Sequence, residues 1–298
     1  MPTATPRTAP TTRVVLHLVA ANDTGATCTL QGHPARSPSW WRHRRKWLPA
    51  RSPASPRPAH CEAARGRDLD TPSRSLARRR LRVKAARSGA GANPGQALYR
   101  LLLRTLGGTA NADAFESLAE SLPLPGLLES AAGQQDRALA LAATLRPHLG
   151  WLPLRRAGVR PAARPERRVD AAAALVAALW PEGAGGAWPA PFTAAPGARV
   201  LLRSLRVAGV GRSLAIELAV NAVIPAAVSS GAWTEDEALD LLLALPSPGT
   251  YGHLRRLEGW LAHGGERPFG SAGRLQAGLL LHGDYCSRGR CGRCPLSS

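Results

Sequence analysis

The chain has 298 residues, of which 44% are hydrophobic and 5% aromatic, and it contains five cysteines. Its net charge is +19, concentrated in residues 1–100, which hold 19 Lys and Arg residues against four acids. A chain of this length can bury one large core or two small ones. No run approaches the ~20 apolar residues of a membrane span, and no signal peptide is recognisable, so a cytoplasmic protein with no membrane partner is predicted.

The first 33 residues are predicted to form a small β remnant. The apolar run VVLHLV at 14–19 is typical of a buried strand, and 27–30 is a second candidate strand after a turn. Two strands do not make a stable sheet alone. Either further strands come from elsewhere, or the beginning of the sheet is missing; counting a missing part would make the fold α+β.

Residues 34–73 are rich in Pro, Ser and Arg without a period and are predicted to be a basic linker. Three tryptophans lie there: Trp40, Trp41 and Trp47. They either stack on nucleic-acid bases or, more commonly, anchor a loop on the core. The arginine runs at 42–46 and 78–87 can neutralise phosphates, and a solvated arm is the equal alternative.

Residues 74–298 are predicted to form a helical domain with bundle-like packing, so the fold class is mainly α. The candidate helices are 75–87, 95–106, 112–122, 134–148, 168–180, 198–207, 212–223, 235–245, 254–263 and 272–284. Prolines mark their expected ends: Pro123, Pro125, Pro153, Pro181, Pro225 and Pro246.

The helical domain ends in a cysteine cluster with the spacing C-x4-C-x2-C: Cys286, Cys291 and Cys294. Reduced, clustered thiols favour a metal over disulfides, and the pattern fits zinc or an iron–sulfur cluster. Both usually take four ligands. His282, four residues before Cys286, or Cys61 can supply the fourth, with Cys28 a weaker candidate. Three arginines are expected to hold the thiols ionised: Arg288, Arg290 and Arg293.

Residues 207–222, VAGVGRSLAIELAVNA, match the second half of a helix–hairpin–helix element. In such an element Gly209 and Gly211 let backbone amides point at a phosphate beside a helix N-terminus, flanked by Arg206 and Arg212. An ordinary helix–helix turn with a C-cap glycine is the alternative. The segment and the later cysteines resemble DNA glycosylases of the endonuclease III type. Because Ser213 stands where the lyase members carry lysine, no glycosylase chemistry is inferred.

Several strings across the chain, in order, resemble a bacterial family catalogued as domain of unknown function 2851. They are VVLHLV, RRLRVKAAR, GQALYRLLLRTLGGTANADAFESLAESLP, GVRPAARPERRVDAAAALVAAL, GVGRSLAIELAVNAVIPAA and the QAGLLLHGDYC ending with its cysteines. The resemblance implies that longer members carry acidic and histidine motifs before the first strand, where carboxylates can bind a divalent cation. This chain is expected to begin after that segment.

Three functions follow as hypotheses. The first is a nucleic-acid-associated binding protein with a C-terminal metal or iron–sulfur site. The second is a truncated member of a metal-dependent, nuclease-like enzyme family. The third is a structural helical protein with a zinc staple. No P-loop, dinucleotide fingerprint or nucleophile elbow is present, so no catalytic residue is nominated and enzymatic activity is left open.

Overall fold

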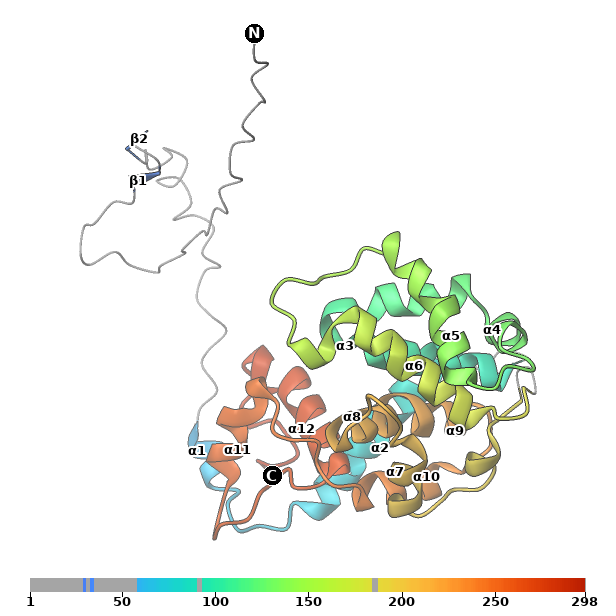
Figure 1. Ribbon diagram of the computed structural model, residues 1–298. Helices are drawn as coiled ribbons and strands as arrows, with labels where there is room; N and C mark the ends of the chain where they lie inside the picture. Colours follow the sequence, from blue (N-terminus) through green and yellow to red (C-terminus); the bar gives the residue numbers. More distant parts are fainter. Residues whose placement is uncertain (1–28, 31–32, 35–57, 90–92, 184–186, 298) are drawn as a thin grey trace. The chain divides into compact units, whose positions relative to one another are not determined.

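The computed structural model describes residues 29–30, 33–34, 58–89, 93–183 and 187–297 (Figure 1). The chain divides into two units, 1–52 and 53–298. In the first, β1 (Thr29–Leu30) pairs antiparallel with β2 (His33–Pro34). The predicted strand at 14–19, the tryptophans at 40–47 and Cys28 lie outside the described residues.

The second unit is helical, which confirms the prediction of a mainly α chain. Its α-helices are α1 (Pro58–Glu62), α2 (Asp70–Ser88), α3 (Pro94–Ser121), α4 (Leu124–Ser130), α5 (Arg137–Leu145), α6 (Pro165–Leu179), α7 (Ala198–Leu205), α8 (Arg212–Leu218), α9 (Ile224–Ser229), α10 (Glu235–Ala244), α11 (Arg255–Leu261) and α12 (Ala272–Asp284). The shorter turns are η2 (Arg146–Gly150), η3 (Pro161–Ala163), η4 (Ala190–Phe192), η6 (Gly252–Leu254) and η7 (Cys286–Arg288), and η5 (Ala219–Val223) is a π-helix.

Helix α1 and the first turn of α2 fall within the stretch for which a linker was predicted. Cys61 and Ala64 are buried there and belong to the same core as the helices that follow. The helical unit therefore includes residue 58 onward. This stretch consists largely of prolines and arginines with few apolar residues, so it has no hydrophobic period from which its helices could be predicted.

The predicted helices 95–106 and 112–122 are two halves of α3. Gly108 (φ 60°) and Asn111 have non-helical backbone angles and break the helix between them. The buried Asn111 accepts a hydrogen bond from the Arg155 backbone N–H (2.7 Å) and donates one to the Arg155 carbonyl (3.0 Å). This amide fixes the kink to the loop after η2.

The prediction of a helix end at Pro225 is wrong, because α8, η5 and α9 form one helical stretch over 212–229. Proline removes one hydrogen bond and crowds the carbonyl four residues earlier, that of Asn221. The π-turn lies at that position and relieves the clash. The stretch is long and apolar enough to cross a membrane, but 61% of it is buried within the unit, as in a core helix.

Helix α2 crosses the middle of the unit and contacts α9, α10 and α12, whereas α6 packs against both α3 and α5 (Figure 1). One continuous core joins both groups, and Tyr99, Phe115 and Phe192 are its largest fully buried side chains. The C-terminal turn η7 follows α12 directly, and α1 packs on α11. The two ends of the unit consequently contribute to one region.

Candidate functional site

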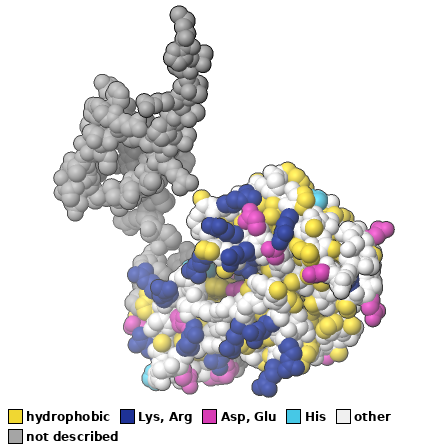
Figure 2. Space-filling model, viewed as in Figure 1, with side chains coloured by type: hydrophobic (Ala, Val, Ile, Leu, Met, Phe, Trp, Pro, Cys, Tyr) yellow, Lys and Arg dark blue, Asp and Glu magenta, His cyan; other side chains and the backbone are white. Residues whose placement is uncertain are grey.

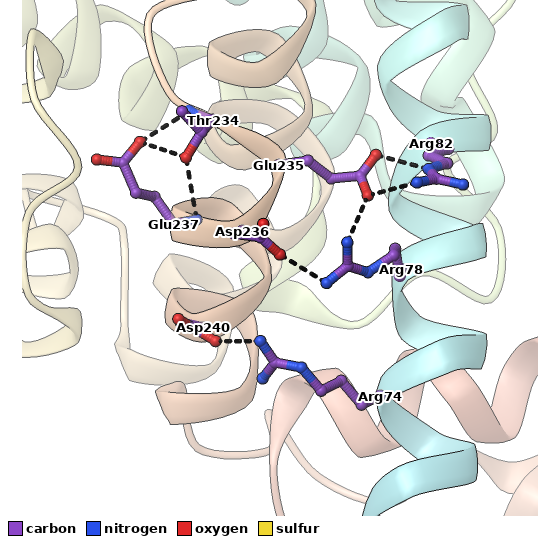
Figure 3. A network of polar contacts seen from close by, with 8 residues as sticks. All are labelled: Arg74, Arg78, Arg82, Thr234, Glu235, Asp236, Glu237 and Asp240. Carbon is purple, nitrogen blue, oxygen red and sulfur yellow. Dashed lines mark hydrogen bonds and ion pairs between the residues drawn. The ribbon is translucent and has the colours of Figure 1, made fainter.

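Most arginines of α2 are bound to acidic residues of the same chain (Figure 3). Glu235 accepts hydrogen bonds from Arg82 (2.6 Å from Nε) and Arg78 (3.2 Å from Nη1). Asp236 and Asp240, further along α10, bind Arg78 and Arg74 at 2.6 Å and 2.7 Å. These three arginines hold α2 against the acidic N-terminal part of α10.

Two further members of this basic run also have partners within the chain. Arg79 pairs with Asp284 at 3.2 Å, and Arg80 donates from Nε to Gln276 at 2.7 Å. Residues 78–82 are therefore part of a packed helix and not of a solvated arm, whereas the run at 42–46 lies outside the described residues. Sequence charge alone could not reveal the pairing, because the acids lie more than 150 residues away.

Helix α7 carries arginines that differ from those of α2. Arg199 and Arg203 are four residues apart and share one face of the helix. Arg206 follows as the C-cap, outside the helix, and all three arginines are exposed. Leu201 and Leu205 are buried against the core on another side. Within the described part of the chain, no carboxylate pairs with any of these three arginines. We name them the arginine stripe.

The arginine stripe leads into the predicted glycine hairpin. The hairpin is exposed at Gly209, Gly211 and Arg212, while Val210 between the glycines is buried as its anchor. Gly209 has φ +77°, and a Cβ there would lie 3.1 Å from the Cβ of Ala171 in α6. Gly209 therefore has a structural reason to be glycine, in accord with the turn alternative.

Gly211 has no such structural reason. Its φ of −78° suits any residue, and an added Cβ would meet nothing within 4 Å. Gly211 is the N-cap of α8, and no side chain caps the helix there. The first backbone N–H groups of a helix need an acceptor, and here no side chain at the N-cap supplies one. Figure 2 shows Lys and Arg side chains gathered in several groups on one face of the helical unit.

Four of the five cysteines lie in one neighbourhood of the helical unit. Cys61 in α1 is buried, as is Cys286 in η7, and neither forms a disulfide. Charges on Cys294 and Cys291 raise the pKa of Cys61, and charges on Cys61, Cys291 and Cys294 raise that of Cys286. Cys61 and Cys286 are 225 positions apart in the sequence, so their proximity brings α1 to the C-terminal turn.

The turn of the last cysteines packs directly on α1. Gly292 (φ +83°) lies against the ring of His60, such that a Cβ would be 3.2 Å from Nε2. The backbone N–H of Arg290 donates to the Tyr285 carbonyl at 2.9 Å and closes the loop. These contacts bring Cys61, beside His60, to the C-x2-C segment.

The expectation that arginines keep these thiols ionised is wrong for the two buried ones. Burial, followed by repulsion between neighbouring thiolates, raises the pKa of Cys61 to about 11 and that of Cys286 to about 12. Arg288 is turned to Asp284 at 3.9 Å. Without a cation both thiols are protonated at neutral pH, and a bound metal would have to displace their protons.

Four thiols match the donor set of tetrahedral zinc or an iron–sulfur cluster. The placement is looser than a ligand sphere: among the described residues, no three His, Cys, Asp or Glu side chains are arranged to hold one ion. The electrostatic coupling of the four sulfurs nevertheless requires them to be neighbours. The donor chemistry fits the group, and closing the sphere requires the sulfurs to approach further.

His282, the other candidate fourth ligand, lies in α12 with its ring 5.5 Å from that of His253, centroid to centroid. The pair lines a cavity of about 280 Å³ together with Arg256, Trp260 and Cys286. Burial and the neighbouring His253 lower the pKa of His282. His282 is thus near Cys286, but His253 is its ring partner, and its charge is not among those acting on the buried thiols.

Sequence reasoning missed a polar group around Lys84. Its amine donates to Asn221 Oδ1 at 2.7 Å, and Asn221 in turn donates to Glu217 Oε2 at 2.7 Å. One signal could have revealed it: only two of the 39 basic residues are lysines, Lys46 and Lys84.

Comparison with known proteins found no matching family model, no matching curated protein and no matching solved structure.

Proposed function

We propose that this protein binds nucleic acid through the glycine hairpin and the arginine stripe, and that its four neighbouring cysteines hold a zinc ion or an iron–sulfur cluster. The observation that carries the first part is the contrast between two sets of arginines. Four arginines of α2 (Arg74, Arg78, Arg79 and Arg82) pair with carboxylates of the chain, whereas those of α7 and the hairpin are exposed and have no carboxylate partner in the described residues.

The geometry suits a phosphate backbone. Arg199 and Arg203 lie about 6 Å apart along α7 at the rise of an α-helix, and Arg206 follows at the C-cap of that helix. At its end the uncapped N-terminus of α8 offers backbone N–H groups and a positive dipole end to an anion. Such contacts bind backbone phosphates and carry no base sequence. Sequence-independent, salt-sensitive binding is the expected behaviour.

The cysteine site supports the function indirectly. The site joins α1 to the C-terminal turn and does not include the hairpin. Its proposed role is therefore to stabilise the fold. Without a cation the two buried thiols, Cys61 and Cys286, would stay protonated. Cys61, Cys286, Cys291 and Cys294 would supply the ligands, and His282 is the substitute if one of them does not.

The experiment is a salt titration of duplex and single-stranded DNA binding. Each arginine that meets a phosphate contributes about one unit to the slope of log affinity against log salt concentration. The double variant Arg206→Ala/Arg212→Ala is expected to lower that slope by about two. Equal elution of the wild-type protein from DNA and neutral matrices would contradict the proposal.

Arg74→Ala is the matched control. Arg74 has the same charge and is also exposed, but it is bound to Asp240. Its removal is expected to leave the salt slope unchanged. A similar loss from Arg74→Ala and from the hairpin variants would mean that net charge, and not this surface, determines binding.

The resemblance to domain of unknown function 2851 remains a proposal, as does a truncated nuclease-like enzyme. One observation favours a structural zinc site without a nucleic-acid partner: the cysteines join the two ends of the helical unit. That reading predicts metal-dependent folding with no retention on nucleic acid, so the salt titration separates the two.

A further inference from the structure

A chain of hydrogen bonds connects four polar side chains where α2 meets the π-helix. Lys84 Nζ donates to Asn221 Oδ1 (2.7 Å) and to the Val220 carbonyl (3.3 Å). Asn221 donates to Glu217, and the Tyr251 hydroxyl donates to the other oxygen of Glu217 at 2.5 Å. The residues Lys84, Glu217, Asn221 and Tyr251 are all half-buried. An amine, an amide, a carboxylate and a phenol thus form one hydrogen-bonded cluster that reaches the surface of the unit.

Lysine at position 84 is unusual for this chain. Arginine fills all but two of its 39 basic positions, and an arginine can also donate hydrogen bonds to an amide and a carbonyl. Arginine cannot lose its proton in a protein, however, whereas lysine can. A requirement for a basic group that can become neutral explains the choice, and charge or hydrogen bonding alone does not.

The surroundings favour the neutral amine. Its two acceptors are uncharged, and no carboxylate forms an ion pair with it in the described part of the chain. Burial of the amine end, followed by the charge of Arg80, lowers the pKa of Lys84 to about 7, against the opposing effect of Glu217. A substantial fraction of this amine is therefore nucleophilic at neutral pH.

We propose that Lys84 is the amine of an imine-forming site for a small aldehyde or ketone that carries an anionic group. The anion is assigned to Arg80, whose charge acts on Lys84 and which uses only Nε in its bond to Gln276. This inference is independent of the nucleic-acid proposal and of the cysteines.

The step balances without any further reactant. The neutral amine attacks the carbonyl carbon, a C–N bond forms, and the carbonyl oxygen takes up a proton to give a carbinolamine. The nitrogen then loses a proton, and the hydroxyl leaves as water once protonated, so that C=N replaces C–O. Glu217 is the carboxylate whose charge acts on the amine and the group assigned to move these protons, with Tyr251 hydrogen-bonded to it.

The test uses pyridoxal 5′-phosphate and pyridoxal, which present the same aldehyde with and without an anionic group. After borohydride reduction, peptide mass spectrometry measures the label on Lys84 and on Lys46, the only other lysine. At pH 7 an amine with the pKa of Lys84 has about a thousandfold more neutral form than an ordinary lysine. Because burial slows access, at least about tenfold faster labelling of Lys84 is expected. Equal or slower labelling of Lys84 in the folded protein would overturn the proposal.

Three comparisons separate reactivity from structure. In denaturant the two lysines should label equally, which shows that the difference belongs to the fold. Glu217→Gln keeps the size of the side chain, so slower imine formation at an unchanged melting temperature supports its proton-transfer role, and an unchanged rate removes that role. Arg80→Met is expected to abolish the preference of Lys84 for the phosphorylated aldehyde. A persisting preference would refute the assignment of the anion to Arg80. The wild-type labelling ratio decides the main proposal even if a variant fails to fold.

Discussion

Substituting each glycine of the hairpin by alanine separates folding from binding at two neighbouring positions. At Gly209 the backbone has φ +77°, and an L-residue in this region costs about 1–2 kcal/mol. The added methyl would also lie 3.1 Å from the Cβ of Ala171, which forces a small displacement of α6. Together these effects predict a loss of about 2–3 kcal/mol of unfolding free energy for Gly209→Ala.

Gly211→Ala is the matched control for stability. Its backbone angles are ordinary, and the methyl meets no atom within 4 Å. Because glycine is favoured over alanine at an N-cap, the unfolding free energy should fall by only about 0.5–1 kcal/mol, less than at Gly209. The same methyl projects into the open space in front of the α8 N-terminus, where the proposed phosphate would lie. It is therefore expected to weaken DNA binding about tenfold, roughly the equivalent of one charged hydrogen bond.

The assays are thermal unfolding by circular dichroism and DNA binding by fluorescence anisotropy at fixed salt. Gly209→Ala should lower Tm by about 4–12 °C, given about 2–4 °C per kcal/mol for a unit of this size. Gly211→Ala should lower Tm by no more than about 4 °C and reduce affinity. If Gly211→Ala binds DNA like the wild-type protein, the hairpin is only a turn and the phosphate assignment is refuted.

Three further predictions concern the cysteines, the ion pairs and the α3 kink. Cys61→Ser should remove bound metal measured by elemental analysis and lower Tm, whereas Cys28→Ser should do neither. The hydrogen bond to Arg82 chiefly lowers the pKa of Glu235. The contribution of Glu235 to stability is therefore present above the ordinary carboxyl pKa and is lost as the pH falls through the lowered value. The Tm difference between wild type and Glu235→Gln should shrink in acid, and a constant difference would contradict the pairing. Asn111→Ala leaves the Arg155 backbone N–H and carbonyl without their partner and should cost about 1–3 kcal/mol in urea unfolding; a loss below 0.5 kcal/mol would show that water replaces the amide.

The helices that could be predicted from sequence are those with an apolar period and a clear start. Helix α10 is an example, because Thr234 and Glu237 form a capping box that is visible in the sequence and present in the structure (Figure 3). Helix α1 could not be predicted, since five residues among prolines and arginines carry no period. The predicted helix end at Pro225 is also wrong. The π-turn that lets the helix continue is a response to local crowding, which helix propensities do not describe.

The candidate sites divide along the same lines. The C-x4-C-x2-C segment and the glycine hairpin are local patterns, so their spacing was readable. Long-range partners are harder to predict: the sequence offers Cys61 only as one of two options for a fourth ligand, and it does not show that acids of α10 bind the arginines of α2. Charge along the sequence therefore does not distinguish an arginine that is paired within the chain from one that is not, and only the three-dimensional structure does.

Metal analysis with a visible absorption spectrum, on protein purified without oxygen, tests the four-cysteine site most directly. A stoichiometric amount of zinc without colour, or of iron with visible absorbance and acid-labile sulfide, is predicted for the wild-type chain. Either signal should disappear in Cys61→Ser and persist in His282→Ala. Metal-free wild-type protein that melts cooperatively would contradict the account, as would a metal content that Cys61→Ser leaves unchanged.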